Sequence, residues 1–489
     1  MSNKPNILVI TGDHWPASLL GCAGHDVIQT PTLDHLSRNG VRFTNAYTEC
    51  PVCIPARRTL LTGTTPRTHG DRTFQVELPM PPMSDIPTFA QVFRDNGYQA
   101  YAAGKLHVYP PRVRAGFDEV MLSEEGRPQL GPTDDYEIYL GDQGHAGEQF
   151  LHGMSNNDYV TRPWHLDERH HVTNWTTRQM SRFIQRRDPT RPSLWYLSYT
   201  HPHPPLVPPQ TYLDMYGLGD IDLPYHGTWP VDHDQMPAWM NNRLIETSHM
   251  NEDDIRRARR AFYALCTHID HQMRVVLGTI REEGLLDNTI IVFLADHGDM
   301  LGNHNLWAKR MFYQDSAAVP MILVGAKGDK RVPVGVTDNR LVGLQDVMPT
   351  ILDLSGIEIP ESVDGLSMVG EEKRSHMYGE YGEGFEATRM IHDGRFKLVY
   401  YAAGNRLQLF DVENDPQELT DLISQPDVIE VQQRLTGLLI TECYGSDLEL
   451  IQDGNLVGLA APPSEPPERG LSLQRGSHWP VPPQGTGPS

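Results

Sequence analysis

The sequence predicts an α/β protein with a large, mainly parallel mixed sheet flanked by helices, followed by a small C-terminal α+β subdomain with a short antiparallel sheet. The first indication is a pair of apolar runs rich in β-branched residues, at 6–11 and 289–295. Continuous runs of this kind suit strands buried on both faces of a parallel sheet. The second is the helical spacing of residues 251–283. The third is the change to short strands from about Ser375 onward.

The chain is expected to divide into three parts. At 489 residues it exceeds a single small core, whereas α/β domains grow large, so residues 1–374 are interpreted as the main domain and 375–445 as the small subdomain. Residues 446–489 are interpreted as a Pro/Gly-rich tail or arm. Residues 110–170 are polar and rich in Gly, Asp and His, which indicates an insertion in the main domain.

Each further element has its own signal. The segment 30–34 is expected to open a helix, the segments 97–104 and 194–199 contain expected strands, and 346–354 is an expected helix. The runs 394–401 and 407–411 flank an Ala-Gly-Asn sequence, which indicates a hairpin. The segment 414–418 is then expected to turn into a helix.

Residues 53–63, Cys-Ile-Pro-Ala-Arg-Arg-Thr-Leu-Leu-Thr-Gly, are predicted to form a short helix with Cys53 at its start. Pro55 suits the first helical turn and Gly63 is placed to end the helix. The start of a helix carries unpaired N–H groups and partial positive charge, so it lowers the pKa of a thiol and attracts tetrahedral oxyanions. Arg57 adds a fork of donors suited to sulfate or phosphate oxygens. The stretch therefore indicates a site that handles an anion.

Other interpretations of Cys53 are open on the residues alone. The segment 50–53 has the Cys-x-x-Cys pattern, which fits a redox pair or half of a zinc site. Cys22, Cys266 and Cys443 form no second pair, so a four-cysteine zinc site lacks ligands. A buried, inert cysteine is the interpretation that composition alone favours.

Acidic residues follow the two apolar runs directly: Asp13 after the first, and Asp296 with His297 after the second. Polar residues just past the carboxyl ends of buried strands gather at the ligand-binding edge of a sheet, so these residues are candidates to converge on one metal ion. Carboxylates with one imidazole suit Ca²⁺, Mg²⁺ or Mn²⁺ better than a thiolate-binding metal. On the residues alone, a structural role is as well supported as metal binding. Asp13 would then cap a helix, and Asp296 would form a turn with Gly298.

The formal net charge of −22 argues against nucleic acid and anionic membrane surfaces as partners. An anionic substrate must then be attracted by local positive charge. No secretory signal is visible at the N-terminus, and no apolar stretch approaches membrane-spanning length. Five cysteines, an odd and sparse set, fit a reducing compartment, so a cytoplasmic location is expected.

The pattern Cys-x-Pro-Ala-Arg-x-x-x-Leu-Thr-Gly at 53–63 resembles the signature of the sulfatase family, within the alkaline phosphatase superfamily. The resemblance implies an alkaline phosphatase-like fold and the conversion of Cys53 to formylglycine (3-oxoalanine) by a formylglycine-generating enzyme. The hydrate of this aldehyde would be the nucleophile. Asp13, Asp296, His297 and residue 53 would hold one divalent metal ion, Ca²⁺ in the first place, with Mg²⁺ or Mn²⁺ as alternatives.

Residues 97–107 resemble the second signature of the family, a strand that ends in Gly-Lys-x-His. The match implies that Lys105 contacts the sulfate and that His107 manages protons on the aldehyde hydrate. Two positions depart from the pattern: Ala100 replaces the usual hydroxyl residue, and His14 stands where many sulfatases carry a second aspartate. The second departure puts the ligand role of His14 and the identity of the metal in doubt.

Two later segments resemble the rest of a sulfatase site. The Pro-His pair that ends at His203 implies that this residue is the acid for the leaving group, with His201 as a weaker candidate. The stretch 302–309 implies that Lys309 binds the anion beside His304. Asp299 and His69 are candidates for supporting positions around the site.

The resemblance implies hydrolysis of a small sulfate ester, such as an aryl, alkyl or sugar sulfate, with Arg57, Lys105 and Lys309 stabilising the charge that develops on the sulfate oxygens. A phosphonate monoester or phosphodiester hydrolase uses the same formylglycine and is the nearer alternative. Lys105 and His107 favour the sulfatase, whereas the Asp-His pair at 296–297 favours the alternative. A non-catalytic polyanion-binding protein would keep a free thiol at residue 53. A homo-oligomer is compatible with the sequence.

Overall fold

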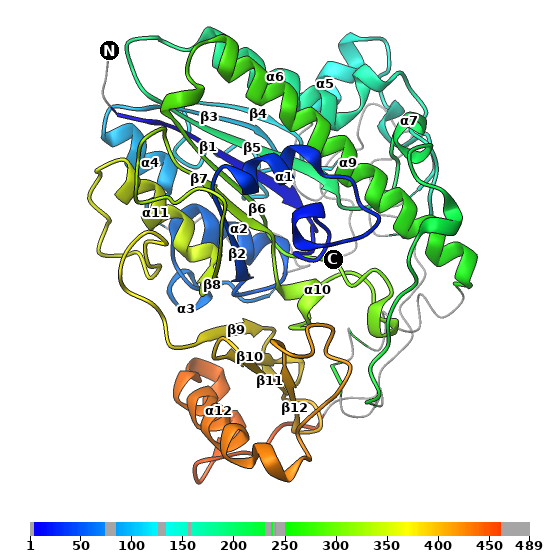
Figure 1. Ribbon diagram of the computed structural model, residues 1–489, viewed down its shortest axis with the longest axis vertical. Helices are drawn as coiled ribbons and strands as arrows, with labels where there is room; N and C mark the ends of the chain where they lie inside the picture. Colours follow the sequence, from blue (N-terminus) through cyan, green and yellow to red (C-terminus); the bar gives the residue numbers. More distant parts are fainter. Residues whose placement is uncertain are drawn as a thin grey trace.

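The computed structural model describes residues 4–73, 85–125, 134–154, 158–229, 236–237, 240 and 250–460. A mixed sheet of eight strands forms its centre (Figure 1). The strands are β1 (Asn6–Asp13), β2 (Val41–Tyr47), β3 (Gln99–Gly104), β4 (Glu119–Leu122), β5 (Ser193–Pro202), β6 (Thr289–Ala295), β7 (Met321–Val324) and β8 (Val336–Gly343). Their order is β4-β3-β5-β1-β6-β7-β2-β8. Only β7 runs antiparallel to its two neighbours among these strands, so the predicted fold class is confirmed.

The two apolar runs of the sequence are the strands β1 and β6, which lie side by side in parallel. Their register pairs Ile7 with Ile290 and Gly12 with Ala295. Every residue of both strands is buried, because helices cover both faces of the sheet, and this explains their continuous apolar sequences. The acidic residues at the carboxyl ends of β1 and β6 therefore leave the sheet at the same edge.

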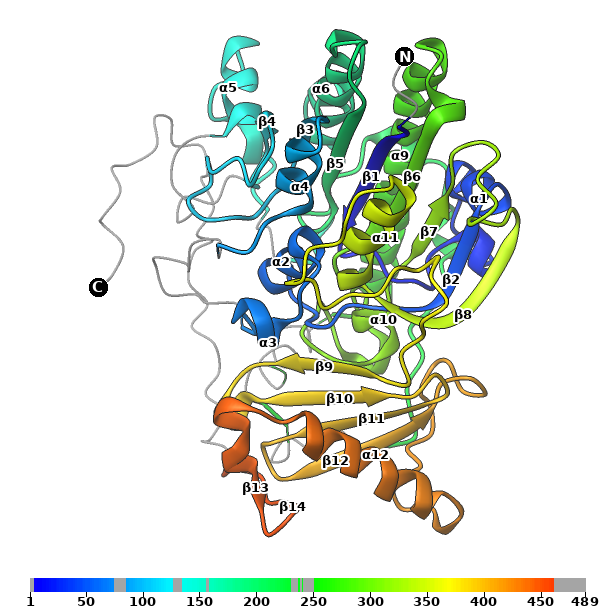
Figure 2. The same cartoon turned by 90° about the vertical axis from the view of Figure 1, so that its left-hand side faces the viewer.

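Helices pack on both faces of this sheet (Figures 1 and 2). One face is covered by α1 (Pro31–Arg38), α6 (Val172–Arg186) and α9 (Glu252–Glu282), and the other by α2 (Cys53–Thr62), α4 (Phe89–Asp95) and α11 (Val347–Leu354). The other α-helices that the structure describes in the main domain are α3 (Pro66–His69), α5 (Asp135–Asp142), α7 (Gln210–Leu213) and α10 (Gln314–Ala317). The helix predicted at 53–63 is confirmed as α2, and Gly63 ends it with a φ of 68°.

A second, antiparallel sheet lies below the main sheet in Figure 1. It consists of β9 (Met377–Tyr381), β10 (Thr388–His392), β11 (Phe396–Tyr401) and β12 (Arg406–Asp411), with α12 (Ile429–Glu442) packed against it. The predicted hairpin is confirmed as β11 and β12. The helix expected directly after 414–418 is wrong, because residues 412–425 form turns and irregular chain. Glu418 has a φ of 55°, which does not continue a right-handed helix, and its buried carboxylate lies 2.7 Å from Lys397 Nζ.

Regular elements occur in two regions interpreted from the sequence as an insertion (110–170) and as a tail or arm (446–489). Within 110–170, β4 pairs with β3 and forms one edge of the main sheet. Residues 446–460 fold against the small sheet and include β13 (Ile451–Gln452) and β14 (Asn455–Leu456), while 461–489 lie outside the described residues. In the described part of the chain, no helix combines the length and the apolar character needed to cross a bilayer.

Gly104 ends β3 at a point where a side chain does not fit. Its φ is +103°, and an added Cβ would lie 1.8 Å from the backbone oxygen of Ser198 on β5. We expect Gly104→Ala to lower the free energy of unfolding by more than about 4 kcal/mol in a denaturant titration, because β3 and β5 must separate. Gly97→Ala is the matched control, since its φ is +88° but its Cβ meets nothing within 4 Å. Gly97→Ala should lower the free energy of unfolding by only about 1 kcal/mol, through backbone strain. Equal losses of unfolding free energy in the two variants would contradict the close approach of Gly104 to the Ser198 backbone.

Candidate active site

Four strand ends of the main sheet deliver charged and imidazole side chains to one place. Asp13 ends β1, Lys105 follows β3, His203 follows β5, and Asp296 with His297 follows β6. All five side chains are buried. These strands are neighbours in the sheet, so their carboxyl ends bring these five residues to the same edge.

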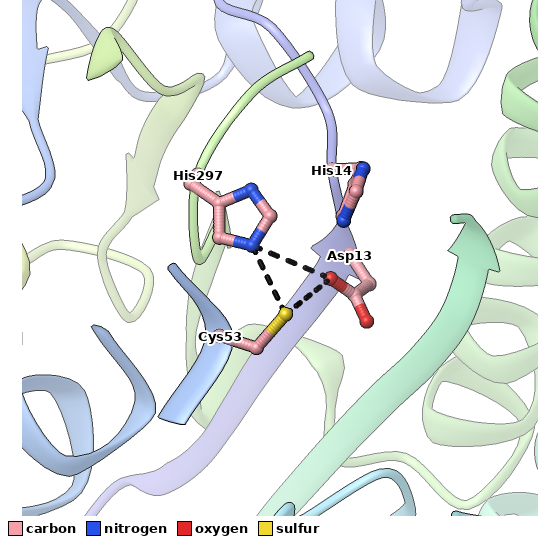
Figure 3. Close-up of side chains that lie close together, drawn as sticks. All are labelled: Asp13, His14, Cys53 and His297. Atoms are coloured by element: carbon pink, nitrogen blue, oxygen red, sulfur yellow. Dashed lines mark hydrogen bonds and ion pairs between the residues drawn. The ribbon is translucent and has the colours of Figure 1, made fainter. Parts of the chain in front are cut away.

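Cys53 begins α2 and points into this cluster (Figure 3). Its Sγ lies 3.2 Å from His297 Nε2 and 4.0 Å from Asp13 Oδ1. Burial alone would raise the pKa of the Cys53 thiol, but the nearby charges of Lys309, Lys105 and His297 hold that pKa well below its usual range. Residue 53 therefore lies in surroundings that favour negative charge.

Arg57 lies one turn further along α2 and ties the helix to three strands. Its Nε donates to Asp296 Oδ2 at 2.9 Å, and its Nη1 donates to the backbone oxygen of Lys105 and to Ser198 Oγ, both at 2.9 Å. Burial opposes the charge on Arg57, but Asp296 more than offsets this and raises the pKa of the guanidinium. The start of α2 is therefore fixed by a permanently charged residue.

Lys105 is a buried cation between two carboxylates. Its Nζ contacts Asp13 Oδ2 and donates to Glu125 Oε1 at 2.7 Å. Burial alone would lower the pKa of Lys105, but Asp13 and Glu125 raise it above its ordinary value. Lys105 therefore stays protonated inside the site.

Lys309 comes from the loop after β6 and faces two imidazoles. Its Nζ contacts His14 Nε2 and lies 3.3 Å from His203 Nε2. His203 Nδ1 donates to the backbone oxygen of Pro204 at 2.6 Å, which directs Nε2 toward the lysine. Burial, assisted by the charge of Lys309, lowers the pKa of His203 well below its usual range.

His14 follows Asp13 with a φ of 70° and is oriented by a buried carboxylate. Its Nδ1 lies 2.9 Å from Asp299 Oδ2, which also accepts a hydrogen bond from the Tyr159 hydroxyl. A carboxylate behind an imidazole fixes the ring and makes its other nitrogen a better ligand. Asp299 therefore supports His14, in agreement with the supporting position expected for it.

Asp13, His14, Cys53 and His297 each offer a ligand atom, and these atoms lie within 4.8 Å of one another (Figure 3). Burial and the neighbouring Asp296 raise the pKa of the Asp13 carboxyl to about 8. Two buried carboxylates at such a position repel each other, and a cation between them would remove that cost. The donor set therefore fits one divalent metal ion.

Asp296, which the sequence also marks as a ligand, lies beside this set of atoms. Its Oδ1 accepts hydrogen bonds from the backbone N–H groups of His297 at 3.0 Å and His14 at 3.3 Å. The same oxygen lies 3.8 Å from His297 Nε2, and Oδ2 is bonded to Arg57. The structure thus adds His14 to the expected group and keeps Asp296 at its border.

His107 reaches the cluster from the loop after β3. Its backbone N–H and that of Leu106 donate to Glu124 Oε1, at 2.8 and 3.0 Å, and its φ is 56°. The side chain of His107 is one of the neighbours that lower the pKa of Cys53. The ring therefore belongs to the surroundings of residue 53.

The other candidate histidines lie outside the cluster. His201 Nδ1 donates to the backbone oxygen of His203 at 2.9 Å. Both ring nitrogens of His304 are bonded to backbone groups of other loops, and His69 Nε2 shares a hydrogen bond with Thr59 Oγ1 at 3.0 Å. These three rings have structural partners, and none of them faces Cys53.

Sequence reasoning missed Glu124 and Glu125, which follow β4 directly. Glu125 Oε1 lies 2.7 Å from Lys105 Nζ and 3.7 Å from His203 Nδ1. The signal was the same as at Asp13, namely acidic residues just past an apolar run. The run at 120–122 is so short that it was included in the polar insertion.

Two family models match the chain. The model described as Sulfatase matches residues 5–357, which is more than half of the chain. The model described as N-sulphoglucosamine sulphohydrolase, C-terminal, matches residues 302–443, across the end of the main domain and the small sheet.

Characterised relatives match over most of their length. The chain is 35% identical to the arylsulfatase of Clostridium perfringens (strain 13 / Type A), over 92% of this chain and 97% of the relative. It is 31% identical to the choline-sulfatase of Rhizobium meliloti (strain 1021), over 87% of this chain and 83% of the relative.

Solved structures share the fold at lower identity. The phosphonate monoester hydrolase of Agrobacterium radiobacter has a TM-score of 0.74 at 21% identity and covers 90% of this chain and 95% of its own. The phosphonate monoester hydrolase of Silicibacter pomeroyi has a TM-score of 0.74 at 24% identity. The match covers 94% of this chain and 99% of the hydrolase. These likenesses establish the architecture alone.

Proposed function

Because the chain belongs to the sulfatase family and is a sulfuric ester hydrolase, we propose that it cleaves a small sulfate ester through a formylglycine formed from Cys53 and one divalent metal ion. The products are an alcohol and inorganic sulfate. The observation that carries this proposal is the position of Cys53 at the start of α2, beside Asp13 and His297 and within the field of two lysines. A sulfate group next to residue 53 would meet cations on several sides.

Three cations are assigned to the sulfate oxygens. Arg57 Nη2 is buried and has no hydrogen-bond partner among the described residues, so it can donate to the anion. Lys105 and Lys309 approach from β3 and from the loop after β6. All three charges are already in place, and Arg57 and Lys105 are buried, so they stabilise the charge that develops as the ester bond breaks.

The metal ion would be held by Asp13, His14, His297 and residue 53, with Asp296 at the border of the site. When bound, such an ion withdraws charge from the sulfate and lowers the pKa of the attacking hydroxyl of the hydrated aldehyde. We propose Ca²⁺ first, with Mg²⁺ and Mn²⁺ as alternatives. The two imidazoles are better ligands for Mn²⁺ than for Ca²⁺, so the metal content of the purified protein decides between them.

Two histidines are assigned to proton transfer. His203 Nε2 points into the site beside Lys309 and is proposed to protonate the departing alcohol oxygen. The negative charge of a bound sulfate would offset the lysine charge that lowers the pKa of His203. His107, whose side chain helps to lower the pKa of Cys53, is proposed to take the proton that releases sulfate and restores the aldehyde.

The competing proposal is a phosphonate monoester hydrolase, which the Asp-His pair at 296–297 favours. The test compares kcat/KM for 4-nitrophenyl sulfate and 4-nitrophenyl phenylphosphonate, with the aldehyde at residue 53 verified by peptide mass spectrometry. We expect at least a tenfold preference (about 1.4 kcal/mol) for the sulfate. A preference for the phosphonate would overturn the sulfatase proposal, and a free thiol with no turnover would support the polyanion-binding alternative.

We also propose a cytoplasmic location and a formylglycine-generating enzyme as the partner in maturation. All five cysteines are free thiols in the structure, which suits a reducing compartment. Cell fractionation tests the location, and recovery of activity on co-expression with the modifying enzyme tests the partner.

A further inference from the structure

A hollow adjoins the catalytic cluster and shares Glu125 and His203 with it. Its wall also includes residues 136, 149, 150, 152 and 164, and none of the four residues that offer metal-binding atoms. The aromatic rings of Phe150 and Trp164 and the side chain of Val207 form part of its wall. The hollow therefore begins where the leaving oxygen of a sulfate ester would lie and ends among apolar groups.

The wall of this hollow carries no unpaired charge among the described residues. Burial lowers the pKa values of His152 and His201 to about 4, so both imidazoles are neutral near pH 7. Glu125 is the one carboxylate in the wall, and it is paired with Lys105. A cationic group in the hollow would have only aromatic faces to meet its charge, whereas an uncharged ring needs no counter-charge.

Two polar atoms in the wall lack a partner. Ser123 Oγ and Gln149 Oε1 are buried and form no hydrogen bond with any described residue. A buried amide oxygen without a partner is costly, and it is satisfied when a ligand brings a donor to it. An amide oxygen can only accept, so the complementary group on the ligand is an O–H or N–H.

We propose that this hollow binds the alcohol part of the substrate, and that the substrate is the sulfate ester of an uncharged phenol with an O–H or N–H donor on its ring. The inference rests on the proposed sulfatase function and names its substrate class. Phe150 and Trp164 contact the faces of the ring, and Gln149 accepts the hydrogen bond from its donor. Ser123 offers a second polar contact nearer the reacting centre.

The test compares 3- and 4-hydroxyphenyl sulfate with the corresponding methylphenyl sulfates, because hydroxyl and methyl groups have nearly the same size. At the better of the two positions, we expect kcat/KM to be at least about fivefold higher for the hydroxyl compound, the effect of one neutral hydrogen bond. Gln149→Leu should reduce that ratio to about one. Gln143→Leu, which changes an exposed glutamine after α5, is the matched control and should keep the ratio of the parent protein.

Each outcome separates this inference from the function on which it rests. Equal rates for hydroxyl and methyl compounds, or an unchanged ratio in Gln149→Leu, would overturn the inference and leave the sulfatase function intact. A higher kcat/KM for choline sulfate than for all four aryl esters would also overturn it. If no ester releases sulfate although the aldehyde is present, the proposed function fails. Calorimetric binding of hydroquinone and 4-methylphenol then tests the hollow, and equal affinities would reject its assignment.

Discussion

Replacement of Cys53 by alanine is expected to lower sulfate release by at least about 10⁴-fold while the fold is retained. Alanine cannot be converted to an aldehyde, so the variant lacks both the nucleophile and one ligand position for the metal. The side chain is small and lies at the start of α2, and the bonds of Arg57 hold that helix without it. Steady-state kinetics and circular dichroism of the purified variant measure the two effects.

Cys50→Ala is the matched control for this experiment. Cys50 is also buried, but burial raises the pKa of its thiol far above the usual value, so it has none of the activated character of Cys53. We expect the control to keep the aldehyde at residue 53 and to lose less than about threefold in kcat/KM. Comparable inactivation of both variants would instead favour a Cys-x-x-Cys redox pair and contradict the assignment of Cys53.

Asp13→Asn is expected to remove the metal ion and to lower kcat/KM by on the order of 10³-fold, because a catalytic cation contributes several kcal/mol to the stability of the transition state. The variant should also lose the rise in melting temperature that added metal gives the parent protein. Without metal, it should be at least as stable as the parent, since burial and Asp296 disfavour the ionised form of Asp13. Elemental analysis and thermal unfolding with and without Ca²⁺ or Mn²⁺ provide the readouts.

Asp270→Asn controls for the loss of a buried carboxylate elsewhere. Asp270 accepts the backbone N–H groups of Thr32 and Leu33, both at 2.9 Å, at the start of α1. The Asp270→Asn variant should be less stable than the parent protein. Its metal content, and the rise in melting temperature on addition of metal, should be unchanged. Unaltered metal content in Asp13→Asn would show that Asp13 is not a ligand.

Much of the fold was predictable because its signals are local. A strand buried on both faces needs continuous apolar residues, so β1 and β6 were visible in the sequence, and with them the edge at which Asp13 and Asp296 emerge. The start and end of α2 were visible through Pro55 and Gly63. The conformation at the end of the 414–418 segment was not visible in the sequence. Its last residue, Glu418, has a positive φ and forms an ion pair with Lys397 on β11, a contact between distant parts of the chain.

The supporting residues of the site were less visible than its central ones. Lys105 and Lys309 belong to recognisable motifs, whereas Glu125 reaches the site from a four-residue edge strand in a polar segment. The role of His14 depends on Asp299, 285 positions later in the chain. Such pairs arise from the packing of separate loops, and no periodicity in the sequence records them.

The burial of α2 also sets an order of events in the life of the protein. All ten residues of the helix are buried, and Cys53 is 1% exposed, so a second enzyme has no access to its thiol once the sheet and helices have closed around it. The proposed conversion to the aldehyde would therefore have to precede folding, on a chain whose Cys53 is still accessible. Chains that folded first would keep the thiol and lack the proposed nucleophile.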